Sequence, residues 1–449
     1  MKRESFGSRF GAIMAMTGSA VGLGNLWRFP YMVGVYGGAA FVLLYTVMLF
    51  LICLPILNAE MIIGRRSKKN AFGAFSVLAQ GSGWRFAGVL MILTPIIVLS
   101  YYSVVGGWSL EYLYRSFIFD FTSVARTQSE LGDIFGRFIS SVWGPLTAHT
   151  VFLAITAAVV AGGVQKGIEN FGKIMMPLLF LIVILIAVRS AMLPGAAEGF
   201  AYLFRPDFSK MTPEVCAAAL GQGFFSLSVG FGIMLTYASY MRKNDNIGKS
   251  SVIIAVSESL FAVIASCAIM PAVFSFGIDP EAGPGLLFEV LPFIFSQMPF
   301  GGIVAILFFI ALAVAALTSS VSILEVGVAY LTEEKHMSRK KASSLLFAVT
   351  WVIGIVCSLS FGPLSDIRIF GDVIFDFTDR FSSDILMTFG ALLIVLFVGW
   401  KMKRSDVRDE FTNGGTIAGN RKIFGIMYFL IRYIAPAGII VIMLTNIIS

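Results

Sequence analysis

Long apolar runs recur from one end of this sequence to the other, and many exceed the roughly 18 residues that mark a helix able to cross a bilayer. Only 13% of the residues are charged, whereas about one quarter of a soluble domain is charged. The runs predict an all-α polytopic membrane protein with a single transmembrane domain over residues 1–449. Eleven spans are expected, at about 9–35, 38–64, 86–118, 147–164, 168–190, 213–240, 247–276, 300–334, 341–361, 376–401 and 421–447.

Basic residues gather in short segments beside the apolar runs, at 65–69, 242–249, 335–341 and 401–404. The positive-inside rule places such segments in the cytoplasm. The net charge of +7 therefore reflects topology, and no nucleic-acid partner is expected. We predict a multi-pass protein of the cytoplasmic (inner) membrane, surrounded by lipid, with its N terminus in the cytoplasm and its C terminus outside. The first run lacks a small-residue cleavage pattern, so it is expected to remain in the fold.

Two of the predicted spans are interrupted in a way that is costly in lipid. The first carries glycines at 18, 22 and 24, followed by Asn25 and Arg28, and the sixth carries Gly230 and Gly232 after two serines. Unwound backbone in hydrocarbon lacks hydrogen-bond partners unless it is buried in protein or lines a cavity. Broken helices five spans apart are typical of transporters built from two inverted repeats, with the binding site between them. We predict repeats at about 9–190 and 213–401, and one extra helix at about 421–447.

Side chains that carry catalysis are scarce and scattered. The four cysteines have no paired metal-ligand spacing, and His336 lies in a charged loop. No nucleophile, metal or phosphate-binding pattern stands out. The sequence therefore predicts a protein that is not an enzyme.

Several short motifs resemble those of the neurotransmitter:sodium symporters, and they occur in the order found in that family. The motifs are Ala20–Pro30, Tyr101–Tyr102, Gln222–Ser226, Thr236–Tyr240 and Leu317–Ser320. The resemblance covers essentially the whole chain and is closest to the bacterial branch, which has eleven spans. It implies a sodium-coupled symporter that imports neutral, apolar L-amino acids, aliphatic ones first and aromatic ones next, by alternating access.

The resemblance also implies two sodium sites, because carbonyls and hydroxyls supply the oxygen ligands that a hard cation needs. One ion would contact the Ala20 carbonyl, Asn25, Ser226, Glu258 and the substrate carboxylate. The other would contact the carbonyls of Gly18, Val21 and Ala315 and the hydroxyls of Thr318 and Ser319. From the residues alone, the hydroxyls of 318–320 could equally bond back to their own helix, and Glu258 could be a protonated acid or half of an interhelical pair.

Glu258 stands where, in our alignment, the family usually has asparagine. Animal relatives use chloride near this position, with a tyrosine, a glutamine and serines around it. Tyr45, Gln222 and Ser226 match part of that set, while Ala262 replaces a serine. We therefore expect the Glu258 carboxylate to supply the negative charge, so that chloride is not required.

By the same resemblance, the substrate pocket would offer no charge to a side chain. Its residues would be Ala20, Gly24, Val98, Tyr102, Phe225, Ser226, Ser228, Phe231, Ser319 and Ile323. Gly24 stands where the monoamine carriers of the family have an aspartate, so a biogenic amine is not expected.

Gates would lie on both sides of this pocket. An Arg28–Asp379 ion pair is expected outside, with Tyr102 and Phe231 as an aromatic lid. Arg3 and Glu333 are expected to pair inside, beside Tyr240, although Arg3 could equally be a topology charge. Two other functions stay open: a proton-coupled carrier that uses Glu258, and an amino acid sensor or channel on the same scaffold. We expect a monomer or a weak dimer.

Overall fold

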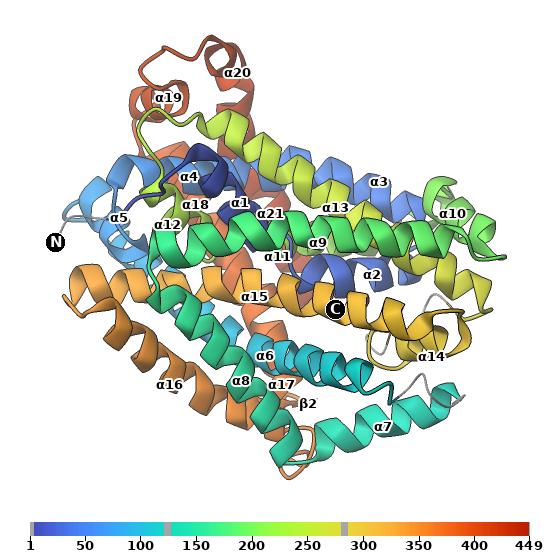
Figure 1. The fold of residues 1–449 in the computed structure, drawn as a ribbon. Coiled ribbons are helices and arrows are strands. Elements are labelled where there is room, and N and C mark those ends of the chain that lie inside the picture. The colour runs from blue at the N-terminus through green and yellow to red at the C-terminus, as the bar shows by residue number, and fades with distance from the viewer. Residues whose placement is uncertain (1–3, 121–126, 280–285, 449) are drawn as a thin grey trace.

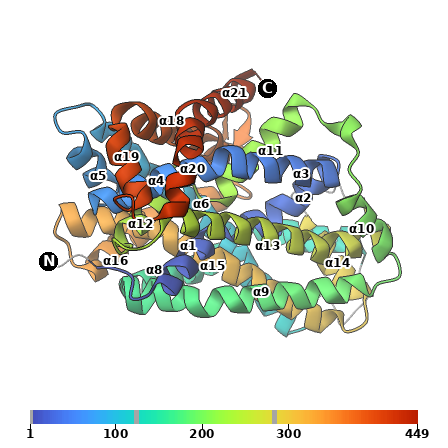
Figure 2. The same ribbon diagram turned by 90° about the horizontal axis from the view of Figure 1, so that it is seen from above.

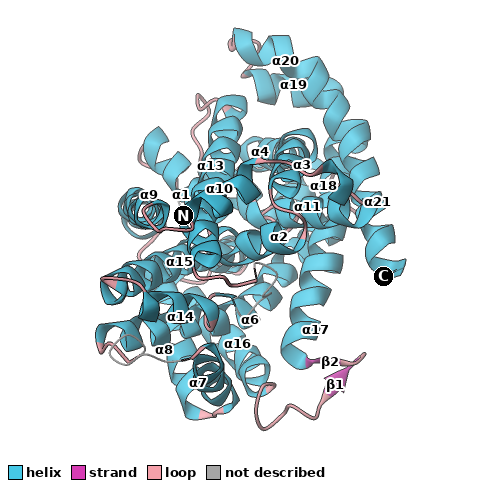
Figure 3. Ribbon diagram, turned by 90° about the vertical axis from the view of Figure 1, so that its right-hand side faces the viewer, coloured by secondary structure: helices cyan, strands magenta, loops and turns pink. Residues whose placement is uncertain are grey.

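Helices make up almost the whole molecule, which we describe from a computed structural model of residues 4–120, 127–279 and 286–448. The long helices run side by side, with the N-terminal end at the left of Figure 1. Figure 3 looks along the bundle and shows how the helices surround one another, with the strands at its edge. The predicted all-α class is confirmed.

Nine helices of the described chain are long and apolar enough to cross a membrane. Each agrees within a few residues with a predicted span, so the expectation of a polytopic membrane protein is confirmed. Several contain a π-helical segment, labelled η. The nine are Ala39–Ser67 (α3, Ala39–Met48; η2, Leu49–Cys53; α4, Leu54–Ser67), Arg85–Phe117 (α6), Trp143–Ala161 (α8), Val164–Ala191 (η3, Val164–Glu169; α9, Asn170–Ala191), Ile247–Ser275 (α13), Gly301–Glu334 (α15), Arg339–Leu359 (α16), Ile374–Lys401 (α17, Ile374–Arg380; η6, Phe381–Met387; α18, Thr388–Leu396; η7, Phe397–Lys401) and Ala418–Thr445, where α20 (Ala418–Phe429) and η8 (Leu430–Ile434) lead into α21 (Ala435–Ile448).

The two interrupted segments are each divided into shorter helices. The first consists of α1 (Arg9–Ala20), η1 (Gly24–Arg28) and α2 (Phe29–Val35), and the other of α11 (Pro213–Ser226) and α12 (Ile233–Tyr240). The second break lies where the sequence predicts it. The first is shorter than predicted, because α1 continues through Gly18 to Ala20. Gly18 is a packing glycine: a Cβ there would lie 3.1 Å from Met176 Sδ and 3.3 Å from Thr318 Cβ.

Short elements cover the two ends of the bundle, as Figure 2 shows. The long segments between the predicted spans contain α7 (Gln128–Ser140), α10 (Ala196–Phe204), the 3₁₀ turn η4 (Phe208–Lys210) and α14 (Val290–Gln297). A hairpin of β1 (Arg368–Ile369) and β2 (Asp372–Val373) precedes α17. At the other end lie α5 (Ala71–Leu78) and α19 (Arg404–Thr412).

Helices α6 and α15 are the most buried of the long helices and lie beside the first break. Their serines and threonines mostly bond back to their own helix: Ser103 Oγ donates to the Leu99 carbonyl at 2.7 Å, and Ser320 Oγ to the Leu317 carbonyl at 3.0 Å. Such local bonds satisfy hydroxyls that lipid could not. A hydroxyl of α6 or α15 that bonds to another helix is therefore an exception to this pattern.

Candidate ion and substrate site

The break in the first helix is closed by Asn25 and by a tyrosine of α6. Asn25 is fully buried, and its Oδ1 accepts a hydrogen bond of 3.1 Å from the Gly22 amide. The Leu23 amide points at the Tyr102 hydroxyl, 3.5 Å away. These contacts provide partners for backbone groups that the missing turn would otherwise leave unsatisfied. Asn25 therefore stabilises the break as well as facing the proposed ion site.

The break in the second segment depends on Glu60 of α4. Its Oε1 accepts from the Gly230 amide at 2.6 Å, and its Oε2 from the Leu235 amide at 3.0 Å. Gly230 and Gly232 have φ values of +95° and +79°, which a residue with a Cβ adopts only at a cost. The carboxylate therefore accepts from one amide within the unwound backbone and from one in the first turn of α12.

Replacing Glu60 by glutamine is expected to destabilise the fold. An amide offers one acceptor oxygen and places an NH₂ group against the remaining backbone N–H. An unsatisfied buried donor costs about 1–3 kcal/mol. The measurement is thermal unfolding in detergent without sodium, compared with Glu258→Gln. Glu258 is equally buried, but one of its oxygens has no donor in the described chain, so an NH₂ group is tolerated there. Equal melting temperatures for the two variants would contradict this role of Glu60.

Glu258 of α13 lies where the two breaks meet. Its Oε1 accepts hydrogen bonds from Asn25 Nδ2, at 2.6 Å, and from the hydroxyls of Tyr45 and Ser226. Its Oε2 is buried and has no hydrogen-bond partner within the described ranges. A buried carboxylate oxygen without a donor is costly unless a cation approaches it. Three of the four protein ligands predicted for the first sodium thus converge. The fourth, Ala20, lines a small cavity together with Asn25 and Ser226.

The residues predicted for the second sodium lie where α1 contacts α15. Gly18 packs against Thr318, and Val21 is fully buried directly after α1. The Thr318 hydroxyl bonds back to the Ala315 carbonyl at 3.0 Å, which is the structural alternative left open above. The Ser319 hydroxyl instead crosses to α1 and donates to the Ser19 carbonyl at 3.2 Å. Oxygen atoms of both helices are therefore available at this contact.

All ten residues predicted for the substrate pocket line one small cavity. Its volume is about 20 Å³, which is room for about one water molecule. None of the described residues that line it is charged. The full lining is Ser19, Ala20, Gly22, Leu23, Gly24, Asn25, Val98, Tyr102, Phe225, Ser226, Ser228, Phe231, Ser319 and Ile323. An amino acid can enter only if these side chains move apart.

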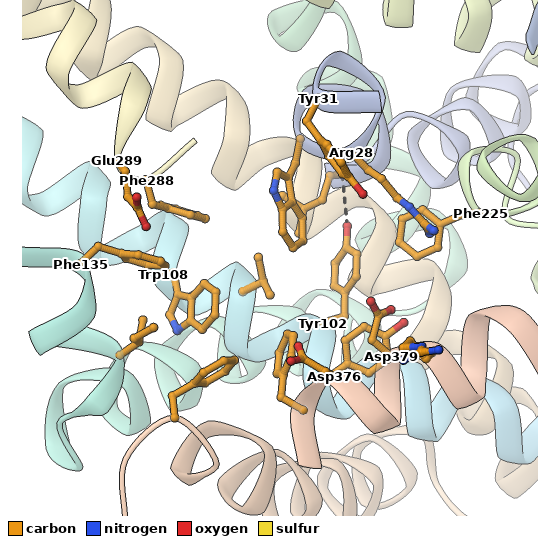
Figure 4. A pocket seen from close by; sticks show the side chains of 18 residues that line it. Arg28, Tyr31, Tyr102, Trp108, Phe135, Phe225, Phe288, Glu289, Asp376 and Asp379 are labelled. Carbon is orange, nitrogen blue, oxygen red and sulfur yellow. Dashed lines mark hydrogen bonds between the residues drawn. The ribbon is translucent and has the colours of Figure 1, made fainter. Parts of the chain in front are cut away.

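A larger vestibule of about 470 Å³ adjoins this cavity. Tyr102 and Phe225 line both spaces, whereas Phe231 lines only the inner one, so the structure places Phe225 rather than Phe231 in the predicted lid. The predicted Arg28–Asp379 ion pair is not formed among the described residues. Both side chains face the vestibule (Figure 4), but the Arg28 guanidinium carbon lies 5.4 Å from the centre of the Phe225 ring. The cation contacts the aromatic face instead of the carboxylate.

The far side of the cavity is closed by contacts of the N-terminal segment. Tyr240 donates to Glu325 Oε1 at 2.6 Å, and Glu325 also forms a buried ion pair with Arg339. The Phe6 amide donates to the Tyr240 carbonyl at 3.2 Å, and Glu4 lies 3.4 Å from Arg339. These contacts connect the start of the chain to three helices.

Of the predicted inner ion pair, only Glu333 lies within the described residues. Glu333 accepts from the amide and side chain of Asn70, at 2.9 and 3.0 Å. Arg3 lies outside the described residues. Tyr240, the third residue predicted for this gate, does take part, through Glu325.

Three polar residues at the site escape sequence reasoning: Glu60, Glu325 and Ser19. The two glutamates carried a usable signal, since an isolated acid inside an apolar span marks a functional position by default. Ser19 carried none, because serine is common in membrane helices.

Comparisons with known proteins agree with this architecture. The model of the sodium:neurotransmitter symporter family matches residues 3–128 and 139–449. The chain is 41% identical to an uncharacterised sodium-dependent transporter, YhdH, of Bacillus subtilis, over 99% of this chain and 97% of that one. It is 25% identical to the sodium- and chloride-dependent GABA transporter ine of Drosophila melanogaster, over 89% of this chain and 46% of that one.

A solved structure extends the match to three dimensions. The crystal structure of MhsT in complex with L-phenylalanine superposes with a TM-score of 0.91 at 42% identity, covering 99% of this chain and 100% of that one. The breaks, the buried carboxylate beside them and the apolar helices are therefore set in a fold shared with a protein that binds an amino acid. The chain belongs to the sodium:neurotransmitter symporter family and is a sodium-dependent membrane transporter, not an enzyme.

Proposed function

We propose that this protein is a symporter that couples the inward movement of sodium to the import of a neutral, apolar L-amino acid by alternating access. The observation that carries the proposal is the Glu258 oxygen that has no donor among the described residues, at a point where Asn25 and Ser226 also converge. A sodium ion there would bridge the two broken segments. A substrate carboxylate bound to the same ion would couple the two solutes.

The chemistry of the cavity supports the substrate class. The backbone at the end of the first break and the Tyr102 hydroxyl suit a carboxylate, since broken-helix termini favour anionic groups. Val98, Phe231 and Ile323 are among the apolar residues of the lining, and no charged side chain of the described chain lines it to pair with a lysine or glutamate side chain. MhsT, which is similar along its whole length, binds L-phenylalanine. We infer aliphatic substrates first and aromatic ones next.

Alternating access is supported by a difference between the two sides of the inner cavity: one adjoins a vestibule and the other is covered. The vestibule reaches the inner cavity at Tyr102 and Phe225, whereas the Tyr240–Glu325–Arg339 contacts cover the other side. We assign the vestibule to the outside and the N-terminal segment to the cytoplasm of the inner membrane. The paired breaks support two inverted repeats, at about 9–190 and 213–401.

Chloride independence and two sodium ions per substrate complete the proposal. In the Drosophila relative, transport depends on sodium and chloride. Here the Glu258 carboxylate already occupies the donors of Tyr45 and Ser226, and it would supply the charge itself. The second ion would bind where Gly18 packs against Thr318.

The decisive experiment is uptake into proteoliposomes that contain the purified full-length protein. We expect leucine, methionine or phenylalanine to accumulate above the outside concentration when sodium is high outside, without chloride and without a pH gradient. Lysine and glutamate serve as matched charged controls. Dissipating the sodium gradient with an ionophore should abolish accumulation.

Each rival function predicts a different result. A proton-coupled carrier would accumulate substrate without sodium when the outside is acidic. A channel would equilibrate substrate without concentrating it, and a sensor would bind it without uptake. Any of these results, or sodium-driven uptake of only lysine or glutamate, would overturn the proposal.

A further inference from the structure

The carbonyl of Ser19 is a shared acceptor for two hydroxyls at the cavity. Ser228 Oγ donates to it at 2.8 Å, and Ser319 Oγ at 3.2 Å. Ser19 is the second-last residue of α1, and the last four carbonyls of a helix have no partner within that helix. The interruption of the helix thus creates the acceptor, and side chains from the second break and from α15 use it.

The hydroxyl of Ser19 makes a separate contact with α15. Ser19 Oγ and Ser322 Oγ are 2.7 Å apart, and Ser322 Oγ donates to the Ser319 carbonyl at 2.7 Å. Because a hydroxyl has one proton, Ser19 is the donor in the pair when Ser322 donates to the Ser319 carbonyl. Both side chains are buried, at 2% and 0% exposure. Ser322 does not line the cavity, so it can affect ligands only through its neighbours.

A hydroxyl that has given its only proton to a carbonyl presents lone pairs in its other directions. Ser228 and Ser319 are in this state and both line the cavity. Lone pairs are what a sodium ion or an ammonium group requires. The backbone of Ser228 has a φ of +52°, a conformation that is costly without glycine and that its bond to Ser19 helps to stabilise.

We propose that Ser19 and Ser322 are positioning residues: their hydroxyl pair holds the Ser19 carbonyl where it orients Ser228 and Ser319 as acceptors for cationic ligands. The inference rests on the proposed function, because it assigns those ligands as sodium and the substrate ammonium group. It predicts that removing the Ser322 hydroxyl weakens sodium-dependent binding although Ser322 contacts no ligand.

Helix α15 offers a matched control. Ser320 Oγ pairs with Thr156 Oγ1 of α8 at 2.8 Å, and both side chains are fully buried. This is also a buried contact between two hydroxyls, of nearly the same length as the Ser19–Ser322 contact, but it joins α15 to α8 instead of α1. The variants S320A and T156A remove a buried interhelical hydroxyl contact without touching the Ser19 carbonyl.

The test measures binding of radiolabelled L-phenylalanine and L-leucine to the full-length protein in detergent as sodium is titrated. In S322A and S19A we expect the half-saturating sodium concentration to rise about three- to tenfold, as loss of one hydrogen bond implies. S320A and T156A should stay within about twofold of wild type, with melting temperatures matching that of S322A. The double variant S19A/S322A should need no more sodium for half-saturation than the more impaired of the two single variants, because each single substitution already removes the same contact.

Equal sodium dependence in S322A and S320A would overturn the inference. Should S322A fail to fold, S19A carries the comparison, because Ser322 keeps its bond to the Ser319 carbonyl there. Failure of the proposed function looks different: the wild-type protein would then bind neither amino acid more tightly with sodium than with potassium.

Discussion

Replacing Glu258 by serine is expected to make sodium-driven uptake depend on chloride. The substitution removes the acceptor for Asn25 Nδ2 and the hydroxyls of Tyr45 and Ser226, and leaves three donors pointing at one space. An anion that enters this space regains those hydrogen bonds and restores the charge beside sodium. Without an anion, sodium-driven uptake should fall by roughly two to almost four orders of magnitude, because losing one partner of a buried ionic pair costs ~3–5 kcal/mol.

The measurement compares uptake in chloride and in gluconate, for wild type and for E258S. Glu60→Ser is the matched control: Glu60 is a fully buried glutamate whose two oxygens are both bound to backbone amides. Its loss should impair uptake equally in both salts. Two results would contradict the prediction that this carboxylate replaces an anion: wild-type uptake that already requires chloride, or uptake by E258S that is the same in chloride and in gluconate.

Substituting alanine for Gly22 is expected to remove sodium-dependent amino acid binding while the protein still folds. A Cβ at this position would lie 2.2 Å from Ser319 Oγ and 3.3 Å from the Tyr102 hydroxyl. Both groups belong to the proposed site, and neither can withdraw without changing the cavity. Overpacking typically costs 1–3 kcal/mol, which corresponds to about a ten- to hundredfold loss of affinity.

Gly221 supplies the control for this substitution. It lies in α11, and a Cβ there would meet no atom within 4 Å. G221A should bind as wild type does and should unfold at the same or a slightly higher temperature, because alanine favours the helix by roughly 1 kcal/mol. Binding of leucine or phenylalanine by G22A at wild-type sodium concentrations would show that Gly22 is not at the site.

The spans and breaks were accessible from the sequence because lipid imposes rules that act residue by residue. An apolar run of sufficient length must become a helix, and glycines beside Asn25 must be buried in protein. The extent of the first break was not accessible. Gly18 weakens a helix in isolation, but its close packing against Thr318 keeps it helical, and that contact depends on a residue 300 positions away.

Contacts between side chains were harder to foresee for the same reason. The sequence indicates Arg28 and Asp379 as complementary charges, but it does not show that the guanidinium lies over the Phe225 ring. Glu60 looks like any isolated acid until the fold places the Gly230 amide 2.6 Å from it. The cavity lining was predictable because the resemblance to a family carried it, residue by residue, and not because spacing along the chain implied it.

The N-terminal contacts have a consequence for translation of the gene. Phe6 bonds to Tyr240, and Ser8 and the Gly7 amide bond to Glu169. A ribosome that started at Met14 would produce a chain that retains every proposed ligand of sodium and substrate. That shorter product would keep Tyr240, Glu325 and Arg339 but lose the N-terminal contacts that cover them, so the choice of start codon alone decides whether this cover is present.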